Sequence, residues 1–192
     1  SQKIPQLIFP KYYSNLTTSR ILTMDWMSGV HLSEFVLHDH PQDVRDKLGQ
    51  TLWDFYMLQI HELKQVQADP HPGNFLVNNN NELIAIDFGC VKKIPNEFYI
   101  PYFKLSKKEN IENKKIFGEL LNELEILLPT DTDEEQTYFK NLFYKMMCLF
   151  TFPFHNKFFN FKNEEFWQDI TNLSKILKND DRLLKMNGNR GS

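Results

Sequence analysis

Three polar side chains between residues 69 and 87 have the types and spacing needed to bind a divalent cation and position a reacting group. Asn74 comes five residues after Asp69, and Asp87 comes thirteen residues after Asn74. A hairpin predicted between Asn74 and Asp87 would bring its two ends side by side. Carboxylate and amide oxygens are ligands for Mg²⁺, and phosphoryl transfer from a nucleoside triphosphate needs them together with a carboxylate near the attacking group. The spacing therefore predicts one polar cluster suited to phosphoryl transfer.

The elements that must position this cluster follow from the apolar pattern around it. Residues 75–77 and 83–86 are short apolar runs joined by residues 78–82, and four consecutive Asn residues there favour a tight turn because Asn tolerates left-handed backbone. Residues 42–65 contain no Pro and carry apolar side chains mainly at helical spacing. They predict one long, largely buried helix that leads the chain to Asp69.

Two strands are predicted before residue 30. Residues 4–10 are expected to form a short edge strand, because Pro cannot donate within a central ladder. Residues 20–26 are rich in β-branched and apolar side chains and end before a Ser-Gly break. Two strands alone make a marginal sheet in water. We therefore expect them to lean on the following helices, or the rest of their sheet to lie outside this chain.

The rest of the sequence is predicted to be helical. Apolar residues at helical spacing indicate three helices, with faces over residues 117–128, 139–150 and 166–177. Pro129 is expected to end the first of them. Thr132 and Glu135 have the spacing of a capping box ahead of the second. Residues 187–192 have the composition of a frayed chain end.

Composition narrows the class of protein. Lys and Arg total 22 against 25 Asp and Glu, a net charge of -3, so no basic footprint for nucleic acid is expected. Two cysteines, Cys90 and Cys148, are too few for a disulfide framework, and a reducing, cytoplasmic context is predicted. The longest uncharged apolar stretch, residues 146–154, is far shorter than the roughly 20 residues of a membrane-spanning helix. Contact with a membrane surface stays open.

Aromatic residues are unevenly distributed. Six of the 17 Phe residues lie in residues 150–161. The preferred interpretation is a Phe-rich corner of the core beneath a loop. The alternative is a surface for a partner, for a missing domain or for a lipid bilayer. Cys90 is interpreted as a small buried side chain, and the alternative is a redox-sensitive residue with a stabilised thiolate.

The full motifs resemble a known family. Residues 68–74 read Ala-Asp-Pro-His-Pro-Gly-Asn and residues 86–89 read Ile-Asp-Phe-Gly, which combines D-x-x-x-x-N with D-F-G, the catalytic-loop and metal-loop pair of protein-kinase-like folds. In this form the pair resembles the UbiB/AarF family of atypical kinases. Residues 16–29 are similar to the strand and hinge of that family. The resemblance covers residue 4 to about residue 93.

This resemblance implies a fold class and a division of the chain. The fold would be α+β but mostly α, a protein-kinase-like C-terminal lobe with the last strands of the N-terminal lobe and the hinge. Residues 1–29 would be the remnant of the N-terminal lobe, and residues 30–192 the helical C-terminal lobe. The family's phosphate-covering loop, strand Lys and helix Glu have no counterpart in the 192 residues. The missing N-terminal lobe of the same protein is therefore an expected partner.

The resemblance also implies roles for five residues. Asp69 would be the catalytic-loop carboxylate, Asn74 and Asp87 would bind Mg²⁺, and backbone groups of Asp25 and Met27 would contact the adenine of ATP. The intact protein would be an atypical kinase or ATPase using Mg²⁺ and ATP, linked to isoprenoid quinone biosynthesis and to a lipid or membrane surface as a peripheral partner. The isolated chain is expected to be inactive.

The catalytic loop departs from that of ordinary protein kinases. The usual His-Arg-Asp is Gln67-Ala68-Asp69 here, so no Arg stands beside the Asp to bind a phosphorylated activation loop. No Ala-Pro-Glu follows the Asp-Phe-Gly. Regulation by activation-loop phosphorylation is therefore not expected.

Two other functions remain as alternatives. A small-molecule kinase of the aminoglycoside or choline phosphotransferase type has similar loops, but Phe88-Gly89 and the hinge argue against it. A non-catalytic pseudokinase scaffold is the second alternative. Retention of Asp69, Asn74 and Asp87 argues against it on the assumption that the two carboxylates are buried, because a buried pair without a metal is costly.

Overall fold

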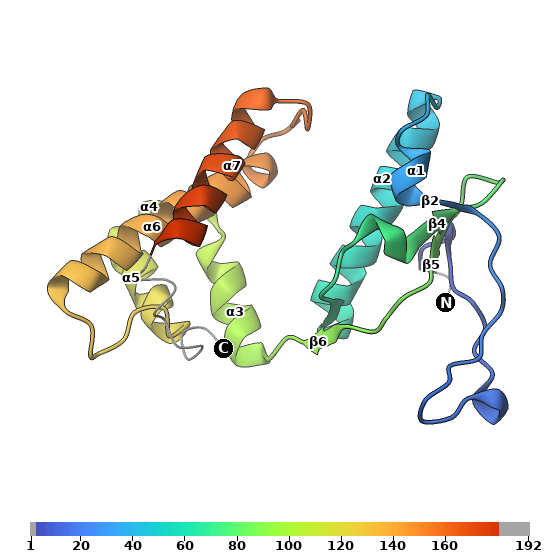
Figure 1. Cartoon of the computed structure of the whole chain (residues 1–192). Coiled ribbons are helices and arrows are strands. Elements are labelled where there is room, and N and C mark those ends of the chain that lie inside the picture. The colour runs from blue at the N-terminus through green and yellow to red at the C-terminus, as the bar shows by residue number, and fades with distance from the viewer. Residues whose placement is uncertain (1–2, 181–192) are drawn as a thin grey trace. The chain divides into compact units, whose positions relative to one another are not determined.

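The computed structural model describes residues 3–180 as a helix-rich α+β chain with two small sheets (Figure 1). The predicted mostly helical fold class is confirmed. Contacts divide the chain into two compact units, Ser1–Ile94 and Pro95–Ser192. The lobe boundary expected at residue 29 concerns a different division and stays a prediction. The predicted frayed end at residues 187–192 lies outside the described residues.

A four-stranded sheet with the order β1-β5-β4-β2 forms the centre of the first unit. Its strands are β1 (Leu7–Ile8), β2 (Val30–His31), β4 (Phe75–Val77) and β5 (Leu83–Ala85). β4 and β5 pair antiparallel, which confirms the predicted hairpin, and Asn81 takes a left-handed backbone in its turn. β1 lies parallel to β5 at one edge, as expected of a strand flanked by prolines.

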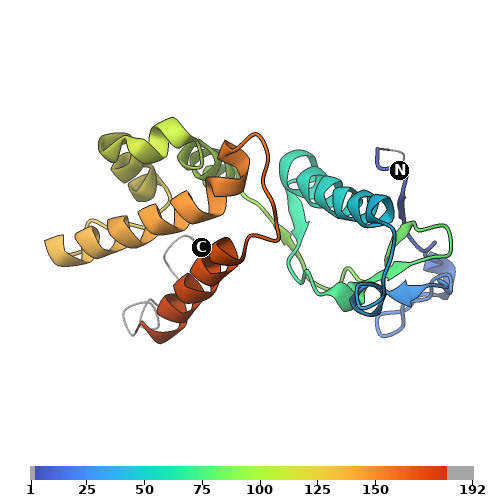
Figure 2. The same ribbon diagram turned by 90° about the horizontal axis from the view of Figure 1, so that it is seen from above.

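One long helix packs on this sheet. α2 (Gln42–Met57) follows the short α1 (Leu32–Phe35) and lies alongside the hairpin (Figure 2). Leu48 and Phe55 on its inner face join a buried cluster with side chains from the sheet. The predicted helix over 42–65 is confirmed with one change. Its last part is a π-helical segment, η2 (Leu58–Leu63), which ends at Lys64 with φ of 52°.

A second, two-stranded sheet was not expected from the sequence. β3 (Gln65–Gln67) pairs antiparallel with β6 (Val91–Lys93), so that Gln67 lies opposite Val91. Each strand has only three residues, and β6 is exposed throughout. Such strands carry too little alternation of apolar and polar side chains to be recognised by pattern.

The strand predicted over residues 20–26 is wrong. Only Met24 pairs there, in an isolated bridge with Tyr12 across a loop that contains the single-turn helix η1 (Ser14–Leu16). The apolar side chains of this segment contact water instead of a sheet, and Trp26 is 92% exposed. Strands need neighbours that cover a face, and the described residues provide none here.

The second unit consists of helices. These are α3 (Asn96–Leu105), α4 (Lys108–Glu112), α5 (Lys114–Glu123), α6 (Asp133–Thr151), η4 (Phe152–His155) and α7 (Glu164–Asn179). α3, α5 and α6 share a buried cluster that includes Leu105, Leu121 and Phe139. The predicted capping box of Thr132 and Glu135 is present at the start of α6.

Two expectations for this unit need correction. The helix predicted to run to residue 128 ends at Glu123, because Glu125 takes a left-handed backbone (φ 56°) and the Ile126 amide turns back to the Leu121 carbonyl at 2.9 Å. The Phe-rich segment is not a buried corner. Several of its rings are exposed, namely Phe150, Phe152, Phe154, Phe158 and Phe161, since the segment is mostly loop and 3₁₀ turn.

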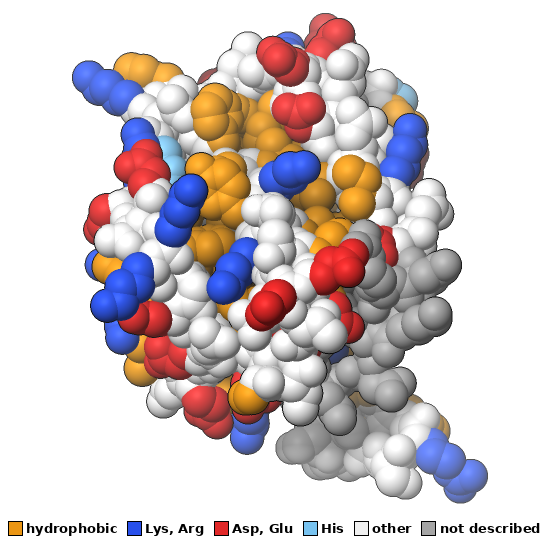
Figure 3. Space-filling view, turned by 90° about the vertical axis from the view of Figure 1, so that its left-hand side faces the viewer, with side chains coloured by type: hydrophobic (Ala, Val, Ile, Leu, Met, Phe, Trp, Pro, Cys, Tyr) orange, Lys and Arg blue, Asp and Glu red, His pale blue; other side chains and the backbone are white. Residues whose placement is uncertain are grey.

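The surface of the helical unit is mixed in character. One face carries hydrophobic side chains between lysines and carboxylates (Figure 3).

Cys90 in the first unit and Cys148 on α6 are both exposed, so the expectation that Cys90 is buried is wrong. Within residues 3–180, no helix combines the length and apolar character needed to cross a bilayer.

Candidate active site and family

Two strand pairs place the predicted catalytic and metal loops next to each other. Beyond the β4–β5 hairpin, the Ile86 amide donates to the Asn74 carbonyl at 3.0 Å. Beyond the β3–β6 pair, the Ala68 amide donates to the Cys90 carbonyl at 2.8 Å. Asp69 directly follows Ala68, and Asp87 directly follows Ile86. The loops that carry the two carboxylates are thus each anchored at a paired backbone position.

Asp69 and Asn74 are in direct contact. The Asn74 side-chain Nδ2 donates to the main-chain oxygen of Asp69 at 2.9 Å and lies 3.4 Å from its carboxylate Oδ2. Between them, the 3₁₀ turn η3 (Pro72–Asn74) is capped by His71, whose Nδ1 accepts from the Gly73 amide at 3.0 Å. His71 therefore has a hydrogen-bonding role within this loop.

Asp87 is held through its carboxylate and through its main-chain oxygen. Its carboxylate Oδ1 accepts from the Gly89 amide at 2.7 Å, which leaves Oδ2 for another ligand. A β-carbon at position 89 would lie 3.1 Å from that same Oδ1, so glycine lets the loop close tightly over Asp87. The main-chain oxygen of Asp87 accepts a hydrogen bond from the side chain of Gln67.

Both carboxylates face solvent. Asp69 and Asp87 are exposed and Asn74 is half-buried, so the cost of a buried carboxylate pair does not apply. The argument against a pseudokinase that rested on burial is therefore wrong. What remains against it is the presence of the three polar groups themselves.

The negative charges of Asp69 and Asp87 each affect the pKa of a nearby tyrosine. Burial raises the pKa of Tyr56, and the negative charge of Asp69 raises it further. Burial likewise raises the pKa of Tyr12, with a second contribution from Asp87. Tyr12 is the residue that bridges to Met24, so the loop before the predicted hinge lies beside the metal loop. Phe9 adds to this contact through its ring, 5.7 Å from that of Phe88.

The predicted hinge residues lie at the end of that loop. The Asp25 amide donates to the Lys11 carbonyl at 2.9 Å, and the Asp25 carboxylate accepts from the Tyr13 hydroxyl at 2.7 Å. These contacts fix Asp25, and within residues 3–180 its main-chain oxygen accepts no hydrogen bond. Met27 lies two residues further on and is half-buried. The structure records no direct contact between the hinge pair and Asp69, Asn74 or Asp87.

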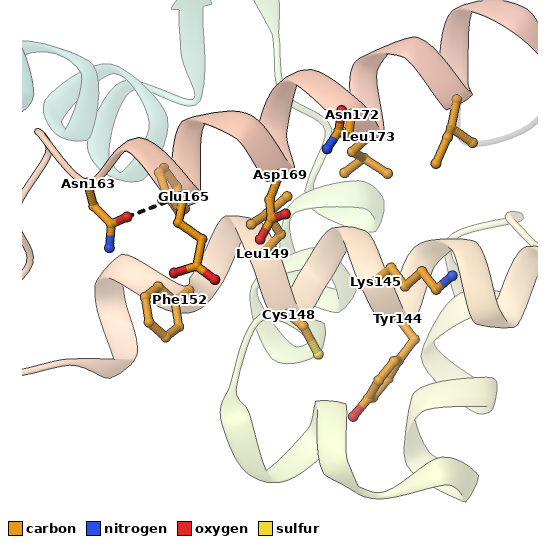
Figure 4. A pocket seen from close by; sticks show the side chains of 12 residues that line it. Tyr144, Lys145, Cys148, Leu149, Phe152, Asn163, Glu165, Asp169, Asn172 and Leu173 are labelled. Atoms are coloured by element: carbon orange, nitrogen blue, oxygen red, sulfur yellow. Dashed lines mark hydrogen bonds between the residues drawn. The ribbon is translucent and has the colours of Figure 1, made fainter.

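A large groove elsewhere is unrelated to these residues. It has a volume of about 580 Å³ and lies within the second unit between α6 and α7 (Figure 4). Tyr144, Cys148 and Leu149 line one side, and the carboxylate of Asp169 projects from the other. None of the five residues predicted from the sequence lines it.

Comparison with known proteins decides the family. Residues 1–119 match the sequence model of the ABC1 atypical kinase-like domain. The chain belongs to the ABC1 family. The resemblance to UbiB/AarF proteins is thereby confirmed, since relatives of this chain carry the ABC1 and AarF names.

Two relatives and one solved structure show the extent of the similarity. The chain is 27% identical to the probable serine/threonine-protein kinase abkA of Dictyostelium discoideum, over 80% of this chain and 29% of that protein. It is 31% identical to AarF domain-containing protein kinase 1 of Xenopus laevis, over 52% of this chain and 20% of that protein. The complex of Rv3197 with erythromycin from Mycobacterium tuberculosis aligns with a TM-score of 0.67 and 19% identity, covering 88% of this chain and 41% of that chain. This ABC1 family chain thus spans less than a third of the length of the two relatives. It shares its fold with Rv3197.

Sequence reasoning missed several residues of the site. Gln59, on the π-helical segment, accepts from the Gln67 amide at 2.8 Å, and the Tyr56 hydroxyl donates to the Gln67 side-chain oxygen at 3.3 Å. Only Gln67 carried a signal, because it stands where ordinary kinases have His. Gln59, Tyr56 and Tyr12 belong to no motif, and only the folded chain brings them to the loops.

Proposed function

We propose that the intact protein is an atypical kinase or ATPase that uses Mg²⁺ and ATP, with Asp69, Asn74 and Asp87 as the working residues of its C-terminal lobe. The contact between Asn74 and Asp69 carries this proposal. This contact fixes the Asp69 carboxylate and the Asn74 amide oxygen in one loop. The pairing of Ile86 with Asn74 anchors the chain one residue before the second carboxylate, that of Asp87. Phosphoryl transfer depends on this kind of positioning more than on covalent chemistry by the protein.

The donor set fits Mg²⁺ bound together with a nucleotide. Asp87 offers Oδ2 and Asn74 offers Oδ1, because their other polar atoms are engaged within the loops. In the described range 3–180, no three His, Cys, Asp or Glu side chains form a metal site by themselves. Mg²⁺ usually takes one or two protein carboxylates and completes its shell with phosphate oxygens and water. When bound, the ion would neutralise the phosphate charge.

Asp69 takes a different role in this proposal. Its carboxylate is exposed and its main chain is fixed by Asn74. A carboxylate held in this way can orient the attacking hydroxyl or water and accept its proton. The acceptor is either a hydroxyl group, in a kinase, or water, in an ATPase.

The hinge and the N-terminal lobe complete the nucleotide site in this proposal. The open main-chain oxygen of Asp25 and the backbone of Met27 would contact adenine. The exposed apolar side chains before residue 30, including Ile21, Leu22 and Trp26, would pack against the rest of the N-terminal lobe. Exposed apolar side chains gathered in one segment commonly mark such an interface.

The biological setting proposed here comes from the family resemblance. We propose isoprenoid quinone biosynthesis as the process served, and peripheral contact with a lipid surface from the cytoplasmic side as the location.

The test is ATP hydrolysis by the full-length protein at varied Mg²⁺ concentration, with and without vesicles containing an isoprenoid quinone precursor. Mg²⁺-dependent turnover that is lost in Asp87→Asn supports the proposal. Glu82→Gln, a change of another carboxylate on the same hairpin, serves as the matched control and should retain turnover. Nucleotide binding without any turnover under these conditions would favour the pseudokinase scaffold. Transfer to an aminoglycoside or to choline would favour the small-molecule kinase.

A further inference from the structure

Two buried glutamines stand behind the loops of the candidate site. Gln59 is 5% exposed and Gln67 is 2% exposed. In residues 3–180, no buried side-chain nitrogen or oxygen lacks a hydrogen-bond partner. A buried primary amide has to be satisfied on both its donor and its acceptor side, and a fully satisfied polar network specifies one arrangement of its surroundings. The partners of these two amides therefore show what the glutamines hold in place.

Each polar atom of Gln67 contacts a different element. Its side-chain oxygen accepts from the Tyr56 hydroxyl on α2 at 3.3 Å, and its Nε2 donates to the main-chain oxygen of Asp87. Its own amide donates to Gln59 on the π-helical segment at 2.8 Å. Gln67 thus ties the last strand before the catalytic loop to α2 and to the metal loop.

The ring of Phe88 packs against the buried cluster of the first unit, but the metal loop makes few other hydrogen bonds. Among the described residues, 87–89 take part in two hydrogen bonds: the one from Gln67 to the Asp87 oxygen, and the one from the Gly89 amide to the Asp87 carboxylate. The second bond lies within the loop. Gln67 is therefore the group through which hydrogen bonding fixes the Asp87 peptide to the rest of the first unit.

The π-helical segment supports this arrangement. π-helical turns are rare, and they occur often at functional sites. Here the turn contains Gln59, whose side-chain oxygen receives the Gln67 amide. Its Nε2 donates back to the Phe55 carbonyl at 3.4 Å, so the amide is satisfied within its own helix as well.

We propose that Gln67 is a positioning residue for the metal loop: its side-chain amide sets where the Asp87 carboxylate lies relative to Asp69. This inference rests on the proposed function for its catalytic consequence, but its structural part does not. Gln67 contacts no reacting group. It acts through the Asp87 peptide, as the groups behind metal ligands commonly do.

Three substitutions at position 67 separate the effect of the Nε2 hydrogen-bond donor from the effect of the volume that the side chain fills. Gln67→Glu keeps the shape and the acceptor for Tyr56 but replaces the Nε2 donor with an oxygen. Gln67→Met fills a similar volume without hydrogen bonds. Gln67→His restores an N–H donor at about the reach of the glutamine Nε2. Gln65→Glu, on the exposed face of the same strand, is the matched control.

The first measurement needs neither metal nor nucleotide. Amide hydrogen exchange of residues 86–90 in the 192-residue chain should become faster in Gln67→Glu and Gln67→Met. It should stay near the wild-type rate in Gln67→His and Gln65→Glu. If exchange in this loop is unchanged in both Gln67→Glu and Gln67→Met, the inference is overturned.

The second measurement is the Mg²⁺ dependence of ATP hydrolysis by the full-length protein. The half-saturating Mg²⁺ concentration should rise about tenfold or more in Gln67→Glu, with recovery in Gln67→His. A purely structural role would lower the amount of folded protein without shifting this concentration, and that result would overturn the inference. Faster loop exchange together with no hydrolysis by the wild type would sustain the placement of Asp87 by Gln67 and contradict the proposed function.

Discussion

The side-chain amide of Asn74 donates a hydrogen bond to the main-chain oxygen of Asp69 at 2.9 Å. This bond closes the catalytic loop across five residues and occupies the nitrogen of Asn74. Its amide oxygen is left for a cation. One side chain therefore fixes the loop of Asp69 and offers a ligand at the same time, so a change at Asn74 has to be separated into these two effects.

We expect Asn74→Asp and Asn74→Ala to differ in the full-length protein. The aspartate variant keeps an oxygen ligand but loses the donor to the Asp69 carbonyl, while the alanine variant loses both. Mg²⁺ affinity should fall more in Asn74→Ala, and the free energy of unfolding should fall by about 1 kcal/mol in either variant. Titration with Mg²⁺ and urea denaturation measure the two effects. Equal Mg²⁺ affinity in the two variants would show that the Asn74 oxygen is no ligand.

Asp87 and Asp69 should respond differently to loss of charge. Asp87→Asn keeps the shape but removes the negative charge, so the full-length protein should lose nucleotide turnover through weakened Mg²⁺ binding. Asp69→Asn should lower kcat and leave Mg-ATP affinity largely intact. Steady-state kinetics with a direct binding assay distinguishes them. An equal loss of nucleotide affinity in both variants would assign Asp69 to the metal or to structure, and full activity in both would remove the enzyme hypothesis.

The sequence predicted correctly the elements whose apolar side chains recur at the spacing of a helix or strand, or whose residues match a known local motif. The β4–β5 hairpin, α2 and the capped start of α6 fall in this group, as do the Asp69–Asn74 and Asp87 motifs. It failed where neighbours decide the structure. Residues 20–26 have the composition of a strand but lack a covering layer, and Leu127 is buried from a loop because a left-handed residue ends α5 early. Gln59 escaped prediction because its role depends on a π-helical turn that no pattern shows.

Tyr56 gives a test of the site that requires no activity. Its pKa is raised above the ordinary value of 10 by burial and by Asp69, so the folded state favours the protonated phenol. This contribution to stability is complete below pH 10 and is lost as the pH rises through the folded-state pKa. Asp69→Asn should lower the pKa of Tyr56 without returning it fully to 10, because burial remains. NMR titration of ¹³C-labelled tyrosine measures the change.

The matched control for this titration is Asp54→Asn. Asp54 is an exposed carboxylate on α2, two residues from Tyr56, and it is engaged with Gln50 at 2.7 Å. It does not contribute to the raised pKa of Tyr56. The Tyr56 titration should therefore be the same in Asp54→Asn and in the wild type. A larger shift in Asp54→Asn than in Asp69→Asn would contradict the placement of Tyr56 beside the catalytic loop.

The 192-residue chain alone should bind ATP weakly or undetectably and show no turnover. Its residues supply the proposed metal ligands and the hinge but no phosphate-covering loop or strand Lys. Isothermal titration with Mg-ATP tests this, with Asp87→Asn of the same chain as the control for metal-dependent heat. Micromolar affinity that is lost in Asp87→Asn would show that the hinge and the metal loop suffice for binding.

Each unit has a core of its own, and these cores should respond separately to mutation. Leu83 in the first unit and Leu121 in the second are both 0% exposed, and they belong to different buried clusters. Truncation of either to Ala leaves a cavity and should cost about 2–5 kcal/mol of unfolding free energy. Leu37→Ala and Phe158→Ala are exposed controls that should stay within about 0.5 kcal/mol of the wild type. Hydrogen exchange read by mass spectrometry should lose protection within residues 3–94 in Leu83→Ala and within residues 95–180 in Leu121→Ala. Equal loss of protection across both ranges in either variant would show that the chain unfolds as one cooperative body.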